Sequence, residues 1–222
     1  RYSDYVFTAE YMNAELRLTL LKAGQSGQKI RLPVRDGVGV GNFDRYMCKV
    51  GLNVLTIKMI GNQCRFYVMD RSKMVMRRPL EYPNAIHVVP AGTVQPAGQE
   101  FIGQEELKLE QTLIREYAEE FFGGKVAAKQ RLLGFLSSGE AKFIITAIGL
   151  DALTQKLEIC GLLVVPDQHL PEQETMSREG LIVPVDRAGL ERFALNAGSM
   201  LPAGALAIWQ ALHYLDGQKG SL

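Results

Sequence analysis

The stretch Arg115-Glu116-Tyr117-Ala118-Glu119-Glu120 decides the fold prediction for this chain of 222 residues. Around it, the apolar residues Leu113, Tyr117 and Phe121 recur every four positions, which predicts one buried stripe along a helix. Within the stretch, the first glutamate lies three and four positions before the other two, and side chains at those offsets are neighbours on a helix surface. We therefore expect three carboxylates within reach of one another on a helix that is fixed by its buried side.

Two interpretations of these carboxylates remain open from the residues alone. Like charges at this spacing destabilise an isolated helix by roughly 0.2–0.5 kcal/mol per pair. A hard divalent cation would reverse that penalty, because Mg2+ is bound by carboxylate oxygens and keeps waters and substrate phosphates as its other ligands. The alternative is a solvated helix face on which Arg115 forms an ion pair with Glu119, four residues further on.

Residues 115 to 120 resemble the core of the Nudix box, Arg-Glu-aliphatic-any-Glu-Glu, with Tyr117 at the aliphatic position. Upstream, the stretch Ile86-His87-Val88-Val89-Pro90-Ala91-Gly92 is similar to the strand and turn that lead into this box. Residues 51–57 and 64–71 resemble the hairpin that opens the Nudix fold. The resemblance implies an α/β fold, a Nudix-like α/β/α sandwich with a central mixed sheet.

The chain departs from the Nudix pattern on both sides of the core motif. The pattern has Gly two residues after the last Glu, where this chain has Phe122 and only then Gly123-Gly124. It has Glu eight residues before the Arg, where this chain has Leu107 preceded by Glu105-Glu106. The shifted glycines still suit a left-handed helix end.

The resemblance implies divalent-metal-dependent hydrolysis of a nucleoside-diphosphate-type substrate, with Mg2+ or Mn2+ as the cofactor. By their positions in the motif, Glu116, Glu119 and Glu120 would be metal ligands or the general base, and Arg115 would orient a carboxylate. The alternative is a catalytically weak or inactive Nudix-like module that senses a nucleotide for a larger regulatory or defence protein. The departures above and a start at Arg1 rather than Met favour this alternative.

A basic cluster precedes the predicted turn, at Arg71, Lys73, Arg77 and Arg78. Because Arg forms bidentate contacts with phosphate, Arg71 and Arg77 are predicted to bind substrate. Gly92, in the turn that leads into the motif, is predicted to do the same. A solvated loop is the competing interpretation of the cluster.

Composition limits the partners of the chain. Hydrophobic residues make up 47% and charged residues 22%, with a formal net charge of +1. This balance supports a folded core and argues against nucleic acid or an anionic membrane as the partner. No apolar run approaches the roughly 20 residues of a membrane helix. The widely spaced Cys48, Cys64 and Cys160 predict reduced, buried thiols and a cytoplasmic location.

The expected organisation is an N-terminal extension over residues 1–45 and a Nudix-like domain over residues 46–222. The alternation of Leu16, Leu18 and Leu20 predicts a half-buried strand in the extension, with a helix as the alternative. This apolar segment offers a contact for a homodimer. Strands are expected at 51–60, 64–70, 86–89, 141–150 and 156–165, and helices at 105–122, 187–196 and 203–215.

Overall fold

The structure is a computed structural model. It describes residues 50–60, 63–73, 86–94, 109–151, 156–177, 179–195 and 200–217. The chain divides into two compact units, and the described residues of Gly51–Gly149 and Glu158–Leu222 belong to one of them. The predicted N-terminal extension and its homodimer contact lie outside the described residues, so they stay predictions.

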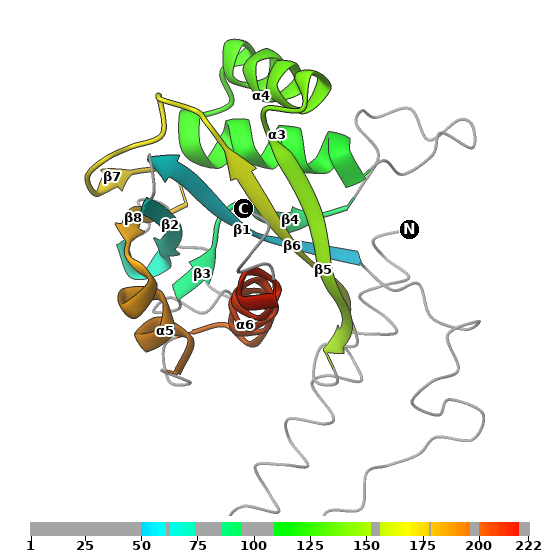
Figure 1. Cartoon of the computed structure of the whole chain (residues 1–222), viewed down its shortest axis with the longest axis vertical. Helices are drawn as coiled ribbons and strands as arrows, with labels where there is room; N and C mark the ends of the chain where they lie inside the picture. Colours follow the sequence, from blue (N-terminus) through cyan, green and yellow to red (C-terminus); the bar gives the residue numbers. More distant parts are fainter. Residues whose placement is uncertain are drawn as a thin grey trace, which may run out of the picture. The chain divides into compact units, whose positions relative to one another are not determined.

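Within the described residues, eight strands form one sheet with the order β5-β6-β1-β2-β8-β7, while β3 pairs with β2 and β4 pairs with β1. The strands are β1 (Val50–Ile60), β2 (Gln63–Asp70), β3 (Ile86–Val88), β4 (Ala91–Thr93), β5 (Lys142–Asp151), β6 (Lys156–Val165), β7 (Thr175–Met176) and β8 (Leu181–Val185). Strand β2 is antiparallel to β1 and to β8. Figure 1 shows β6 beside β1 and running in the same direction, so the sheet is mixed.

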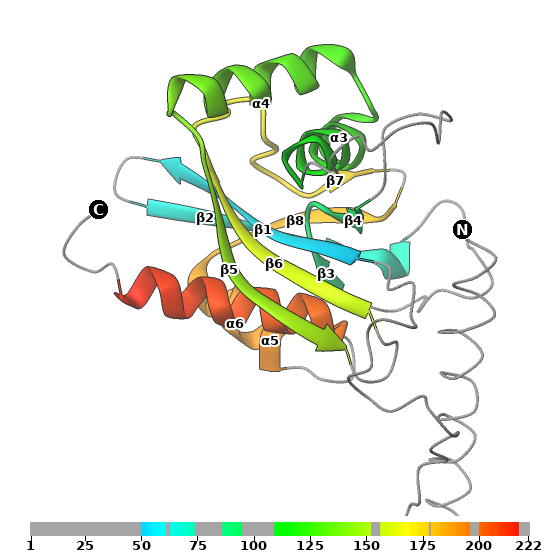
Figure 2. The same ribbon diagram turned by 90° about the vertical axis from the view of Figure 1, so that its right-hand side faces the viewer.

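Helices cover both faces of this sheet. Helices α3 (Leu109–Phe122) and α4 (Val126–Ser138) lie on one side, and α5 (Arg187–Leu195) and α6 (Pro202–Gly217) lie on the other (Figure 2). A short 3-10 helix, η3 (Arg71–Lys73), follows β2. The prediction of an α/β sandwich with a central mixed sheet is therefore confirmed.

The α5 and α6 side of the sheet holds a core of buried apolar side chains. Leu55 of β1, Leu162 of β6 and Leu190 of α5 are buried there together with Ile208 and Leu212 of α6. Full burial of an aliphatic side chain contributes about 1.5–3 kcal/mol, so these contacts fix α5 and α6 firmly on the sheet. This leaves the opposite face to α3 and its glutamates.

Several parts of the fold are absent from the sequence-based expectation: helix α4, the β7–β8 hairpin, the short strand β4 and the short 3-10 helix η3. Lys125, which precedes α4, gives no side-chain cap, and in this helix only Ala128 and Leu132 are buried. The usual start signal and a wide apolar stripe are therefore both missing. In β8, Pro184 is a residue that normally argues against a strand.

The end of α3 matches the prediction from the two glycines. The helix ends at Phe122, and Gly123 and Gly124 adopt φ values of 64° and 82°. The N–H of Gly123 donates to the Glu119 carbonyl at 3.1 Å, so the shifted glycine still closes the helix. The predicted first turn at residues 105–108 lies outside the described residues.

The cysteine prediction is wrong for one thiol. Cys160 is buried, but Cys64 is exposed, because it lies at the start of β2, opposite the exposed Met59. Cys48 lies outside the described residues. No helix in the described part of the chain is long and apolar enough to cross a membrane.

Candidate active site

Helix α3 is held against the sheet by aromatic side chains. Tyr117 is fully buried, and the Phe121 ring meets the Tyr67 ring of β2 edge to face, with centroids 5.6 Å apart. Such pairs contribute about 0.5–1.5 kcal/mol beyond their buried area. The stripe predicted from the spacing of Leu113, Tyr117 and Phe121 is confirmed, and it fixes the position of every glutamate on the helix.

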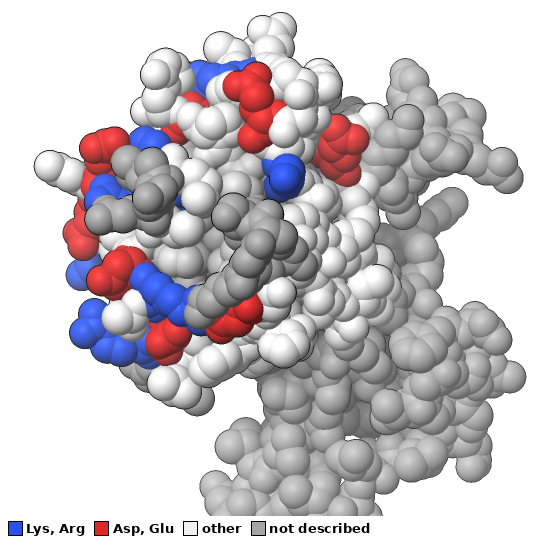
Figure 3. Space-filling model, viewed as in Figure 1, with Lys and Arg blue, Asp and Glu red and all other residues white. Residues whose placement is uncertain are grey.

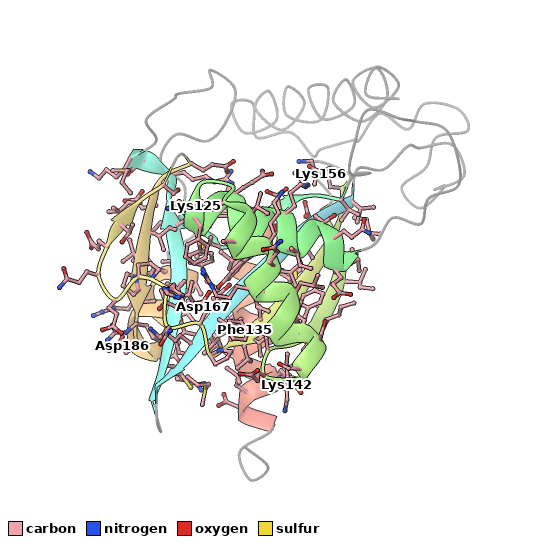
Figure 4. The ribbon with its side chains drawn as sticks, turned by 90° about the horizontal axis from the view of Figure 1, so that it is seen from above. Lys125, Phe135, Lys142, Lys156, Asp167 and Asp186 are labelled. Carbon is pink, nitrogen blue, oxygen red and sulfur yellow. The ribbon has the colours of Figure 1, made fainter. Side chains whose placement is uncertain are left out.

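A buried carboxylate anchors the other end of Tyr117. The Tyr117 hydroxyl donates to Oδ2 of the fully buried Asp167 at 2.7 Å, and Nε of Arg131 donates to the same oxygen at 2.9 Å. The second oxygen, Oδ1, accepts from the backbone N–H of His169 at 2.8 Å. Asp167 lies on the loop after β6, next to α3 and α4 (Figure 4). This contact joins both helices to that loop.

The three motif glutamates differ in exposure. Glu116 and Glu120 are only 7% and 2% exposed, whereas the Glu119 side chain is 45% exposed. The solvated-face interpretation therefore describes Glu119 but is wrong for Glu116 and Glu120. These two residues lie one helical turn apart, and both contact the short strand β4.

The backbone of strand β4 contacts the side chains of the two buried glutamates. The N–H of Ala91 donates to Oε2 of Glu120 at 3.0 Å. Gly92 lies directly against the Glu116 carboxylate, and a Cβ at this position would overlap it. The sequence therefore needs glycine here to admit Glu116, while a role of Gly92 in substrate binding stays a prediction.

Arg115 contacts Glu116, while its role of orienting a carboxylate for catalysis stays a prediction. Its Nη2 lies 2.8 Å from Oε1 of Glu116 and donates to the carbonyl of Thr93 at 3.2 Å. Its Nη1 lies 3.9 Å from Oε2 of Glu119, so the ion pair of the alternative interpretation is also present. The Arg115 guanidinium thus contacts the buried Glu116, the exposed Glu119 and the backbone of β4.

Two further charged residues approach Glu120 from the other side. Nη2 of Arg71, the first residue of η3, lies 4.0 Å from Oε1 of Glu120 and 3.3 Å from Oε2 of Glu179. Glu179 is a site residue that sequence reasoning missed. It lies in the turn between β7 and β8, and the pairing of Asp70 with Leu181 brings that turn to η3. No local signal marks it. Arg77 lies outside the described residues.

The buried carboxylates favour their protonated forms. Burial raises the pKa of Glu116 to about 7; Arg115 opposes this shift, and the charges of Glu119 and Glu179 add to it. Burial likewise raises the pKa of Glu120 well above its ordinary value, with Glu179 acting in the same direction and Arg71 opposing. These shifts mark a site that gains from an added positive charge.

The carboxylates fit a hard divalent cation by their chemistry. Oε1 of Glu120 is buried and has no hydrogen-bond partner among the described residues, and an unsatisfied buried oxygen is costly. Carboxylate oxygens are the donors that Mg2+ and Mn2+ prefer. Across the described part of the chain, however, no three His, Cys, Asp or Glu side chains are arranged to hold a metal ion. The predicted metal ligands therefore stay a prediction.

The pKa of Glu116 predicts how stability depends on pH without metal. Between its ordinary value of 4.5 and about 7, the unfolded chain releases this proton while the folded chain retains it. Stability should therefore fall as pH rises through this window, by about 3 kcal/mol at most, and level off above it. Urea unfolding of wild type and Glu116→Gln across this range measures the effect. An equally steep fall in the variant would contradict it.

The charges on the surface drawn in Figure 3 do not form a patch of one sign. Acidic and basic side chains of the described residues lie interspersed there. The arrangement agrees with the net charge of +1, which gives no long-range attraction for a polyanion.

Comparisons with known proteins give matches among solved structures only. No family model matches the chain, and no curated protein matches it. The NUDIX domain of Shewanella oneidensis NrtR, complexed with ADP ribose, is 14% identical over 80% of this chain and 94% of that chain, with a TM-score of 0.47. A mutT/nudix family protein from Listeria innocua is 10% identical over 77% and 96%, with a TM-score of 0.48. A NUDIX hydrolase from Alicyclobacillus acidocaldarius is 16% identical over 73% and 90%, with a TM-score of 0.44. All three carry the name of the family that residues 115 to 120 resemble.

Proposed function

We propose that this chain is a divergent Nudix-type hydrolase that cleaves a nucleoside-diphosphate-type substrate with the help of Mg2+ or Mn2+. The observation that carries the proposal is the burial of Glu116 and Glu120 on a rigid helix, with one carboxylate oxygen of Glu120 left without a partner among the described residues. Glu116 is paired with Arg115 at 2.8 Å, but the charge nearest to Oε1 of Glu120 is the Arg71 guanidinium at 4.0 Å. Proteins seldom bury a carboxylate oxygen in this way unless it is paired or coordinates a metal.

The residues of the site have distinct roles in this proposal. Glu116 and Glu120 hold the cation, with Glu119 at the exposed edge and Arg115 fixing the carboxylate of Glu116 through a charge-assisted hydrogen bond. When bound, a divalent ion neutralises diphosphate oxygens and lowers the pKa of an attacking water. Arg71 lies next to Glu120 and is placed to contact the phosphates of the substrate.

A second candidate function is a nucleotide sensor with little or no turnover. The observation in its favour is that, in the described residues, no three acidic or imidazole side chains are arranged around a metal position. The same fold and basic residues would then bind a nucleotide without completing a catalytic metal site. Fold alone does not decide between the two functions.

One experiment separates the two functions. The protein is incubated with a panel of sugar-nucleotide and dinucleoside phosphates, with Mg2+ or with EDTA, and both product formation and thermal shift are measured. Metal-dependent cleavage of any member supports the hydrolase. A thermal shift without product supports the sensor, because ligand binding alone stabilises the folded state. Neither cleavage nor a shift across the panel would overturn both.

A further inference from the structure

The position of Arg71 is set by the backbone on both sides of it. Asp70 ends β2, and its Oδ1 accepts from the N–H of Ser72 at 2.9 Å, which fixes the turn. Gly180 packs on the same backbone, because a Cβ there would lie 2.5 Å from the Asp70 carbonyl oxygen and 3.1 Å from Cα of Arg71. The guanidinium therefore reaches Glu120 and Glu179 from a rigid base.

The contacts of Arg71 leave one polar atom unbonded on each side of its pair with Glu120. Its Nη2 donates to Oε2 of Glu179 at 3.3 Å and lies 4.0 Å from Oε1 of Glu120. Both Nε of Arg71 and Oε1 of Glu120 are buried without a hydrogen-bond partner among the described residues. A well-formed pair exists elsewhere in this chain, where Arg187 donates to both oxygens of Asp216 at 2.9 and 2.7 Å. Arg71 thus makes one long hydrogen bond to Glu179, lies too far from Glu120 for another, and forms a bidentate pair with neither carboxylate.

We propose that the Arg71 guanidinium is the resident counter-ion of this site and competes with the divalent cation for Glu120 and Glu179. The inference rests on the metal site of the proposed function. Arg71 supplies a positive charge while the metal is absent, but its geometry leaves the buried oxygen of Glu120 unbonded. A compact cation approaching that oxygen must first displace the guanidinium or share the carboxylates with it. The affinity for metal is therefore lower than the carboxylates alone would give.

The test measures Mn2+ binding to the nucleotide-free full chain by isothermal titration calorimetry. Arg71→Gln should bind Mn2+ about tenfold more tightly than wild type, which corresponds to about 1.4 kcal/mol. Arg71→Lys keeps the charge and should stay near wild type. The matched control is Arg65→Gln, which removes the same charge from β2, where Arg65 donates to the carbonyl of Glu172 at 2.9 Å. This control should leave Mn2+ affinity unchanged.

The outcomes separate this inference from the proposed function. Equal Mn2+ affinity in wild type and Arg71→Gln overturns the counter-ion role alone. An equal gain in Arg65→Gln also overturns it, because net charge would then explain the effect. Failure of wild type and Arg71→Gln alike to bind Mn2+ overturns the inference and the metal site together. Thermal melts of each variant verify that it is folded, and a purely structural Arg71 would lower the melting temperature without tightening Mn2+ binding.

Discussion

Glu120→Gln is expected to abolish most of the metal-dependent turnover while the protein stays folded. The loss of one carboxylate from a metal site removes several kcal/mol of transition-state stabilisation, and a loss of about 4 kcal/mol corresponds to roughly a 10³-fold lower rate. The fold survives because the amide oxygen of glutamine can still accept the hydrogen bond from Ala91, which Glu120 now accepts at 3.0 Å. Initial rates with saturating Mg2+ and a melting curve without metal give the two readouts.

The melting temperature of the metal-free protein shows whether Glu120 serves the metal site or the stability of the fold. Burial and the charges of Glu179 and Glu116 disfavour an ionised Glu120, so a neutral amide should leave the melting temperature at or above that of wild type at alkaline pH. A large loss of stability would indicate instead that Glu120 serves the fold. The activity loss would then say nothing specific about catalysis.

Two helix positions serve as comparisons for Glu120→Gln. Glu110 lies in the first turn of α3 and is exposed, so Glu110→Gln makes the same change of charge outside the site and should keep wild-type turnover. Glu119→Gln tests the half-exposed motif residue on its own. Wild-type turnover in Glu120→Gln or in Glu119→Gln would remove that residue from the proposed metal site.

The sequence predicted α3 and its glutamates because their pattern is local. The spacing of Leu113, Tyr117 and Phe121 specifies one buried side of a helix whatever the rest of the chain does. The same spacing places Glu116 and Glu120 one turn apart. Helical periodicity could not decide whether these carboxylates meet water or protein, since their burial depends on strand β4, which another part of the chain supplies.

The residues that the sequence missed depend on contacts between distant segments. Glu179 reaches the site only because β8 pairs with β2, and Asp167 meets Tyr117 across 50 positions of sequence. Asp167 follows Pro166 and accepts from the N–H of His169 in a turn, but such a turn does not predict a contact with Tyr117. Glu179 belongs to no periodic segment that would mark its role. Burial of Asp167 and exposure of Glu119 are likewise decided by packing, which a count of charges does not reveal.

Asp167→Ala is expected to lower the free energy of unfolding by about 3–5 kcal/mol, the range found when one partner of a buried ion pair is removed. Asp167 is fully buried, and its Oδ2 accepts from both Tyr117 and Arg131. The substitution leaves the Tyr117 hydroxyl without its acceptor and the Arg131 guanidinium without its counter-charge, although Arg131 keeps its contact with the Phe122 ring at 4.8 Å. Urea unfolding followed by circular dichroism measures the loss.

Asp186→Ala is the matched control for this loss, because it removes the same side chain from an exposed position. Asp186 accepts from the N–H of Gly189 at 2.7 Å at the start of α5, and losing such a helix cap costs about 1 kcal/mol. Tyr117→Phe should also cost about 1 kcal/mol, because it removes one hydrogen bond and keeps the packed ring. If Asp167→Ala destabilised the protein no more than Asp186→Ala, the network of Tyr117, Asp167 and Arg131 would not be what holds α3 and its glutamates in place.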